Sequence, residues 1–209
     1  MSFRKEKKYR LSYSDMLLIK RFLLNSNMTE LFPKRVVNSC YFENNKFELF
    51  HDSEEGVLPR KKVRVRWYSQ RLLDHSEKKF SCSKEVKISS VEGRYKIVDK
   101  FNSLMNIDDV RELNFFDNIY GNLTPVLIVS YEREYYGLKK LRITFDRNIT
   151  YKYQRKSNYS NQLIDNECVM EVKVPIDCDD DYIEKIISHP TSRFSKYSRG
   201  LLIHNAQSY

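Results

Sequence analysis

The chain has 209 residues, which is enough for one domain with a sizeable core, and we expect a single domain over residues 1–209. Its 37 Lys and Arg against 28 Asp and Glu give a net charge of +9, which favours acidic partners such as nucleotides, polyphosphate, nucleic acid or anionic lipid. No segment approaches the roughly 18 continuous apolar residues of a membrane span, and Cys40, Cys82, Cys168 and Cys178 lack zinc-site spacing, so we expect reduced thiols in a cytoplasmic protein.

The N-terminal part of the chain is predicted to form strands around one strong helix. Alternation of apolar and polar residues predicts a strand over residues 3–11. Ser12 and Ser14 are good N-caps, and the run DMLLIKRFLLN beside them has apolar residues at helical spacing, which predicts an amphipathic helix. Further strands are expected over residues 37–43, 61–69 and 80–88, and the polar segment 51–60 indicates an exposed loop.

The C-terminal part continues this pattern of strands and short helices. Helices are expected over residues 107–117 and 180–188, and the Asp-rich CDDDY of the second suits the positive end of a helix. Capping explains these aspartates better than a metal site does. Strands are expected over residues 125–136, 140–148 and 168–175, with a polar loop over 153–162. The predicted fold class is α+β, mostly antiparallel strands with a few covering helices.

The segment KKVRVRWY at residues 61–68 has the most regular alternation in the chain. Successive side chains of a strand point to opposite faces, so Lys62, Arg64 and Arg66 share one face, and the apolar residues between them share the other. Later strands repeat this pattern of charged residues two apart. A polyanion should meet such a face, but periodicity leaves open an exposed surface, a closed channel or an ordinary solvated sheet face.

Carboxylates stand among the cations on most of these faces, at Glu6, Glu85, Asp146 and Glu171. A surface for nucleic acid gains from cations and loses from neighbouring carboxylates, so nucleic acid is not the expected partner. Carboxylates beside Lys and Arg suit Mg²⁺ or Mn²⁺ that bridges them to phosphate oxygens. They suit cross-strand ion pairs equally well, and the residues alone leave both interpretations open.

A series of short motifs runs along nearly the whole chain, from residue 3 to about residue 200. The motifs are R-x-E-x-K-Y at Arg4, Y-F-E at Tyr41, K-V-R-x-R at Lys62, E-x-K at Glu85, Y-x-R at Tyr131, R-I-T-x-D at Arg142, E-V-K at Glu171 and F-S-K-Y-S-x-G at Phe194. Their order resembles the catalytic domain of the vacuolar transporter chaperone (VTC) polyphosphate polymerases, which are triphosphate tunnel metalloenzymes. The related CYTH hydrolases typically begin with E-x-E-x-K, and Arg4 at the first glutamate favours the VTC branch.

The resemblance implies an antiparallel β-barrel tunnel with a charged lumen and a few covering helices. It implies that Glu171 binds Mn²⁺ or Mg²⁺, and that Glu6 either contributes to this metal site or positions Lys8. It also implies catalytic cations that hold phosphates and a second group that binds substrate. The catalytic group is Arg4, Lys8, Arg64, Arg66, Lys87, Arg133 and Arg142, and the substrate-binding group is Tyr131, Arg193, Ser195 and Lys196.

The implied reaction is transfer of the γ-phosphoryl group of ATP to a growing chain of inorganic polyphosphate. Two alternatives remain. One is a metal-dependent tripolyphosphatase or nucleoside triphosphatase of the same fold, and the other is a non-catalytic module that binds polyphosphate or nucleic acid. The SPX domain and transmembrane helices of fungal members do not occur in this sequence, so we expect any membrane attachment to come from a partner.

Overall fold

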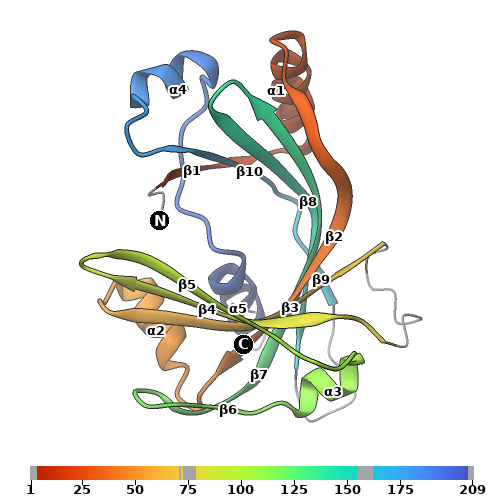
Figure 1. Cartoon of the computed structure of the whole chain (residues 1–209), viewed down its shortest axis with the longest axis vertical. Helices are drawn as coiled ribbons and strands as arrows, with labels where there is room; N and C mark the ends of the chain where they lie inside the picture. Colours follow the sequence, from red (N-terminus) through yellow and green to blue (C-terminus); the bar gives the residue numbers. More distant parts are fainter. Residues whose placement is uncertain (1–3, 71, 73–78, 155–161, 207–209) are drawn as a thin grey trace. The chain divides into compact units, whose positions relative to one another are not determined.

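The computed structural model describes residues 4–70, 72, 79–154 and 162–206 (Figure 1). The strands are β1 (Arg4–Leu11), β2 (Thr29–Glu43), β3 (Arg60–Ser69), β4 (Cys82–Ser90), β5 (Gly93–Lys100), β6 (Phe115–Asp117), β7 (Gly121–Leu138), β8 (Leu141–Tyr153), β9 (Gln162–Ile164) and β10 (Cys168–Pro175). The helices are α1 (Tyr13–Asn25), α2 (Glu48–Glu55), α3 (Ile107–Glu112), α4 (Asp180–Ile186) and α5 (Lys196–Ala206).

The strands form a mostly antiparallel sheet in the order β1-β10-β8-β7-β2-β3-β4-β5, with β6 beside β7 and β9 beside β8. This arrangement confirms the predicted α+β class. The predicted barrel is wrong, because the order is an open path: within the described residues, β1 pairs only with β10 and β5 only with β4. A barrel requires its two edge strands to be hydrogen-bonded to each other.

A segment of irregular chain occupies the outer edge of β1. The N–H of Ser192 donates to the carbonyl oxygen of Lys8 at 2.8 Å, and the N–H of Arg10 donates to the hydroxyl of Ser192 at 3.2 Å. These bonds use backbone groups that a neighbouring strand would otherwise need. At the other end of the order, β5 carries Lys96 and Lys100, and lysines are typical of edge strands that resist pairing.

The chain divides into two compact units. The first unit comprises Met1–Arg35, Tyr131–Ile149 and Ile164–Phe194, and the second comprises Val36–Ser130, Thr150–Leu163 and Ser195–Tyr209. The long strands β2, β7 and β8 contribute residues to both units. Each unit is described by itself below, and the single domain stays a prediction.

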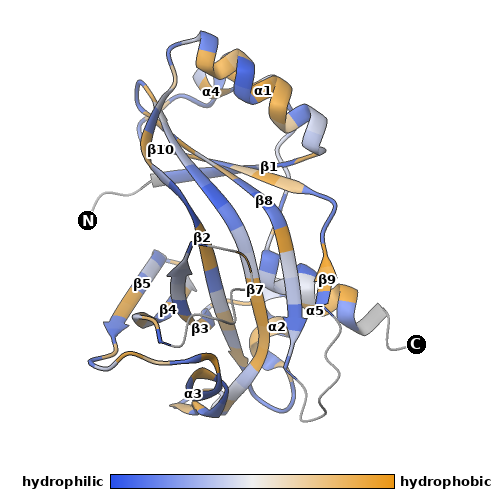
Figure 2. Cartoon of the chain, turned by 90° about the vertical axis from the view of Figure 1, so that its right-hand side faces the viewer, coloured by the Kyte–Doolittle hydropathy of each residue, from blue (hydrophilic) through white to orange (hydrophobic). Residues whose placement is uncertain are grey.

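The first unit buries one face of its strands beneath α1 and α4. Tyr9 of β1, Ile143 of β8 and Met170 of β10 are fully buried in one cluster with residues of both helices. Helix α1 begins after Ser12, whose hydroxyl accepts the N–H of Asp15 at 3.0 Å, as the N-cap prediction requires. Its hydropathy alternates along its length (Figure 2). The predicted apolar face of the later strands is therefore confirmed as a core face.

The second unit has a separate core on the apolar side of β3. Val63, Val65 and Trp67 are buried together with residues of β2, α2, α3 and β7. Trp67 stacks on Phe80 with ring centroids 4.8 Å apart and the planes at 9°. Burial of each such side chain stabilises the fold by about 1.5–3 kcal/mol. The alternation in KKVRVRWY thus separates a core face from a charged face.

Three local predictions were wrong. Helix α2 occupies part of the predicted loop 51–60 and ends at Glu55, followed by the C-cap residue Gly56, which has a φ of 80°. Helix α3 ends at Glu112, because β6 begins at Phe115 within the segment predicted as helix. Strand β5 was not predicted. Most of the predicted loop 153–162 lies outside the described residues.

The four cysteines and the helices agree with two predictions from the sequence. All four cysteines are free thiols and buried, and burial raises the pKa of Cys82 to about 11, which keeps that thiol protonated. In the parts of the chain that the structure describes, the helices are too short or too polar to cross a membrane. The cytoplasmic location stays a prediction.

Gly200 allows α5 to lie against the strands of the second unit. A Cβ atom at this position would lie 2.6 Å from Cδ1 of Tyr151 and 2.7 Å from Cδ2 of Leu127. Gly200→Val is therefore expected to lower the free energy of unfolding by about 1–3 kcal/mol through overpacking, measured by urea denaturation. Leu202→Val, on an exposed position of α5, is the control. Equal effects of the two substitutions would contradict the close packing.

Candidate functional site

In the first unit, the strand face opposite the core carries alternating cations and carboxylates. The register places Lys8 opposite Glu171 and Glu6 opposite Lys173. The Lys173 ammonium lies 2.8 Å from Oε1 of Glu171 and 3.7 Å from Oε2 of Glu6. The Lys8 ammonium lies 3.3 Å from Glu6 and donates to the carbonyl of Phe194 at 2.9 Å. The structure thus brings together the predicted residues Glu6, Lys8 and Glu171.

Arg133 lies on the same face and is held by Asp146. Its Nε donates to Oδ1 at 2.5 Å and its Nη2 donates to Oδ2 at 2.6 Å. Asp146 is fully buried, and Nη2 of Arg133 also lies 4.0 Å from Glu171. Two parallel bonds fix the plane of the guanidinium. Burial alone would lower the pKa of Arg133, but Asp146 outweighs burial and raises that pKa well above its usual value.

Glu171 is ionised in this setting. Burial alone would raise the pKa of Glu171, but Arg133, Lys173 and Lys8 outweigh burial and hold the pKa well below its usual range. Tyr131 is buried beside this group, with the Arg133 guanidinium carbon 5.1 Å from its ring centroid. The predicted residue Arg142 is exposed, and its guanidinium carbon lies 5.9 Å from a ring of β2, that of Phe32.

In the second unit, the strand register arranges the charged face in three rows. The rows are Lys62, Lys87 and Lys96; then Tyr41, Arg64 and Glu85; then Ser39, Arg66, Ser83 and Lys100. Successive rows are about 7 Å apart, because two residues of a strand separate them. Three lysines occupy the first row and Arg66 and Lys100 the third, so a polyanion that follows β3 meets cations at each step.

Arg64 lies in the middle row and is oriented by two protein side chains. Its Nε and Nη2 donate to Oε2 of Glu85 at 2.7 and 2.5 Å, and its Nη1 donates to the hydroxyl of Tyr41 at 3.1 Å. Glu85 also accepts from Lys96 at 2.5 Å and lies 3.7 Å from Nη1 of Arg66. Burial would raise the pKa of Glu85, but these cations lower it to about 2. Glu85 is therefore the counter-ion of three cations.

Tyr41 is a member of this face to which the sequence assigned no role. Burial would raise the pKa of Tyr41, but Arg64, Arg66 and Lys87 outweigh burial and lower it to about 7. Its ring stacks on Tyr197 of α5, with centroids 4.8 Å apart and the planes at 28°. Tyr41 thus links the charged face to α5. Its position in the motif Y-F-E, at the end of β2, is the sequence signal that could have identified Tyr41.

The N-terminus of α5 meets the first row of lysines. The Lys62 ammonium donates to the hydroxyl of Ser195 at 2.9 Å, and this hydroxyl also accepts the N–H of Ser198 at 3.3 Å. Ser195 therefore caps α5, and Lys196 is the first residue of the helix. A helix N-terminus beside a lysine favours anions, because its unpaired N–H groups carry partial positive charge.

The remaining predicted residues are exposed or have side chains outside the described part of the chain. Lys87 is exposed in the first row, and Arg193 is exposed in the segment before α5, within the first unit. The side chain of Arg4 lies outside the described part of the chain. Each unit thus has its own charged cluster, and the tunnel that would join the two clusters stays a prediction.

A metal ion would need ligands beyond those that the protein places together. Among the described residues, no group of three His, Cys, Asp or Glu side chains could hold a metal ion. Glu6 and Glu171 instead share the Lys173 ammonium. Mg²⁺ is often bound by one or two carboxylates together with substrate phosphates. The pair therefore fits a metal that arrives with a phosphate ligand, and its metal role stays a prediction.

The comparisons with known proteins concern the family and the fold of the chain. The sequence pattern of the VTC domain matches residues 3–205. The chain belongs to the VTC domain family. No protein of curated function matches this VTC domain in sequence.

Two solved structures share the fold of this VTC domain. A candidate adenylate cyclase from Vibrio parahaemolyticus has a TM-score of 0.52 and 12% identity, and the match covers 96% of this chain and 98% of that one. A candidate adenylyl cyclase from Hippeastrum, described with a dominant triphosphatase activity, has a TM-score of 0.52 and 11% identity, with 95% of each chain covered. At these identities the likeness concerns the fold alone.

Proposed function

We propose that this VTC domain transfers the γ-phosphoryl group of ATP to a growing chain of inorganic polyphosphate. The observation that carries the proposal is that each unit holds one arginine side chain in a fixed orientation. Arg133 is fixed by Asp146 and Arg64 by Glu85, and both lie on faces with further cations. Phosphoryl transfer needs little covalent chemistry from the protein and depends mainly on positioned positive charge. Membership of the VTC domain family supports this assignment.

In the first unit, Lys8, Arg133 and Arg142 would bind phosphate oxygens near the reacting group. Glu171 and Glu6 would hold Mn²⁺ or Mg²⁺, and a bound ion would neutralise charge that develops on the transferred phosphoryl group. Because its neighbours keep Glu171 ionised, the carboxylate is ready for a cation at neutral pH. Arg4 and Tyr131 would add contacts to the same phosphates.

In the second unit, the rows of β3 and β4 would hold phosphates of the nucleotide or of the polyphosphate chain. Arg66 and Lys87 would bind phosphates directly. Ser195 and Lys196 would hold the polymer at the N-terminus of α5, where Lys62 adds a further charge. Arg64 would act with its orientation fixed by Glu85 and Tyr41. Arg193 is the remaining cation proposed for polymer binding.

A metal-dependent triphosphatase is the second candidate function. The fold likeness to the Hippeastrum protein, for which a dominant triphosphatase activity is described, favours this candidate. The same residues would hold a triphosphate, and water would take the place of the polyphosphate acceptor. The two functions therefore differ in the acceptor and not in the phosphate-binding groups.

Product analysis separates the candidates. The protein is incubated with ATP and Mn²⁺ or Mg²⁺, with and without a short polyphosphate primer, and products are resolved by gel and phosphorus NMR. We expect long chains and ADP. Orthophosphate without longer chains, released together with ADP from ATP or with pyrophosphate from tripolyphosphate, would establish the hydrolase instead. Binding without any turnover would contradict both functions and identify a binding module.

Glu171→Gln tests the carboxylate in the same assay. The substitution should lower turnover by more than about tenfold and shift the metal dependence to higher concentration, because the amide carries no charge for the cation. Glu184→Gln, an exposed position on α4 in the same unit, is the matched control and should leave turnover unchanged. Equal activity of the two variants would exclude a metal role for Glu171.

A further inference from the structure

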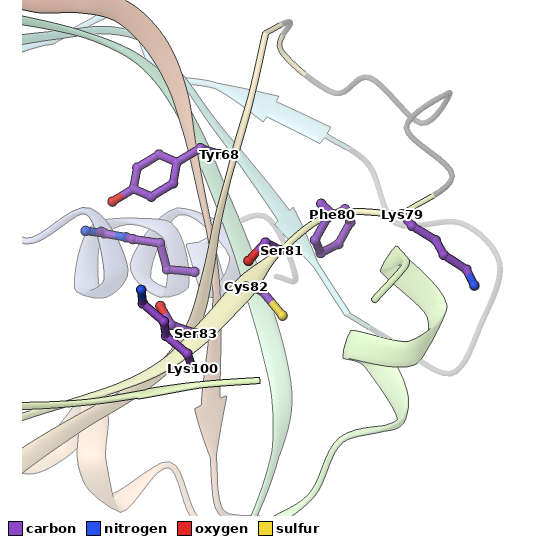
Figure 3. Close-up of a pocket in the computed structure, with 8 residues that line it drawn as sticks. Tyr68, Lys79, Phe80, Ser81, Cys82, Ser83 and Lys100 are labelled. Carbon is purple, nitrogen blue, oxygen red and sulfur yellow. The ribbon is translucent and has the colours of Figure 1, made fainter. Parts of the chain in front are cut away.

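A pocket of about 550 Å³ lies in the second unit, where β3 ends and β4 begins (Figure 3). We call it the Tyr68 pocket. It is lined by Arg66, Tyr68, Lys79, Phe80, Ser81, Cys82, Ser83 and Lys100. Sites for small molecules commonly have volumes of roughly 300–1,000 Å³, so the pocket is large enough for one. Its lining residues come from one unit, and their relative placement is therefore defined.

The lining of the Tyr68 pocket is cationic. It includes Arg66, Lys79 and Lys100, and its described lining contains no carboxylate. Arg66, Ser83 and Lys100 lie in register across three neighbouring strands, which places both cations and a hydroxyl in one row. Arg66 is oriented by its bond from Nε to the hydroxyl of Ser39 at 3.2 Å. The pocket is thus continuous with the third row of the charged face and suits an anionic group.

Tyr68 supplies an aromatic surface beside these cations. It lies two residues beyond Arg66 on β3, and therefore on the same face, and 44% of the residue is exposed. Phe80 differs, because it is only 8% exposed and stacks on Trp67 in the core. Figure 3 shows the ring of Tyr68 directed away from Phe80. An exposed aromatic ring next to two neighbouring cations matches a ligand that has both a flat base and phosphates.

The two ends of β3 differ in the chemistry that they offer. At the end near Lys62, the helix N-terminus and Ser195 provide charge and hydrogen bonds. At the other end, Arg66 leads to Tyr68. Arg66 lies four positions after Lys62, a distance of about 13 Å along the strand. A nucleotide and an inorganic chain could thus occupy opposite ends of the same charged face.

We propose that the Tyr68 pocket binds the nucleoside portion of the ATP donor. The base stacks on Tyr68, its phosphates reach Arg66 and Lys100, and the hydroxyls of Ser81 and Ser83 contact the ribose or the edge of the base. The proposal rests on the function proposed above. It adds that the protein distinguishes a nucleoside triphosphate from inorganic tripolyphosphate, and that the phosphate chain extends from the pocket toward Lys62.

Calorimetric titration with two ligands tests the pocket. The ligands are the non-hydrolysable analogue β,γ-imido-ATP and tripolyphosphate, each with Mg²⁺. Tyr68→Ala should weaken binding of the ATP analogue about tenfold, as loss of an aromatic stacking platform does, and change tripolyphosphate affinity by less than about twofold. Tyr68→Phe keeps the ring and should bind the analogue as the natural chain does. Phe116→Ala, an exposed aromatic of the same unit outside the pocket, is the control.

Each outcome separates the pocket from the general phosphate site. If Tyr68→Ala weakens both ligands equally or neither of them, the nucleoside assignment is wrong while phosphate binding stands. If the natural chain binds tripolyphosphate but not the ATP analogue, the pocket is not a nucleoside site. If the natural chain binds neither ligand, the proposed function fails together with the inference. The retained ring of Tyr68→Phe distinguishes loss of stacking from loss of folding.

Discussion

Asp146→Ala is expected to lower the free energy of unfolding by about 3–5 kcal/mol, because it leaves the largely buried guanidinium of Arg133 without its main counter-charge. Asp146 is fully buried and accepts two bonds from Arg133. The next carboxylate, Glu171, is 4.0 Å from Nη2 and is engaged by Lys173 at 2.8 Å. It cannot replace both bonds. Urea denaturation followed by circular dichroism measures the loss.

A double substitution and an exposed pair control this result. Removal of both members of a buried ion pair is often nearly neutral, so Asp146→Leu with Arg133→Met should recover most of the lost stability. Asp108→Ala breaks the exposed pair with Arg111 and should cost less than about 1 kcal/mol. If Asp146→Ala is as mild as Asp108→Ala, the pair does not stabilise the first unit.

Glu43→Gln is expected to stabilise the protein at pH 8 and to flatten its pH dependence. Glu43 is fully buried at the end of β2, and its Oε2 accepts the N–H of Leu49, in the first turn of α2, at 3.3 Å. Burial raises the pKa of Glu43 from 4.5 to about 8 despite bonds from backbone N–H groups. The folded state therefore binds this proton more strongly than the unfolded state does. The contribution of Glu43 to stability is complete below pH 4.5, falls as pH rises toward 8, and is constant above it.

The expected size of this effect follows from the shift. At about 1.4 kcal/mol for each pH unit, the loss between pH 4.5 and 8 is about 4–5 kcal/mol before solvent relaxation, and we expect a few kcal/mol. Glutamine keeps the shape and stays neutral, so its stability should change little over this range. Urea titrations at pH 5 and pH 8 measure the difference. Glu55→Gln, at an exposed position at the end of α2, should show the same pH dependence as the natural chain. A profile for Glu43→Gln parallel to that of the natural chain would contradict the prediction.

Local patterns predicted most of the fold because they report what each strand buries. The alternation of Val63, Val65 and Trp67 identified a core face, and the N-cap at Ser12 identified the start of α1. Strand β5 escaped prediction because most of its residues are exposed and its sequence lacks a buried face. The segment around Ser192 occupies the outer edge of β1. This segment is far from β1 in sequence and has no periodic pattern.

The sequence predicted the strand face on which each site residue lies, but not the residue with which it forms an ion pair. Periodicity placed Arg64 and Glu85, or Arg133 and Asp146, on charged faces of their strands. It could not say that an arginine would bind each carboxylate, because the pairing depends on which strands become neighbours. Tyr41 depends on the same long-range register. The arrangement of the two clusters as one tunnel stays a prediction.

The buried carboxylates beside Arg64 and Arg133 have a consequence for how ligands bind. A mobile arginine has about 2 kcal/mol of side-chain conformational entropy. In this protein, Glu85 and Asp146 remove much of that freedom when the chain folds. The entropic cost of ordering the two guanidinium groups therefore falls on folding and not on association. An incoming phosphate chain loses conformational entropy of its own on binding, but the two arginine side chains lose little more.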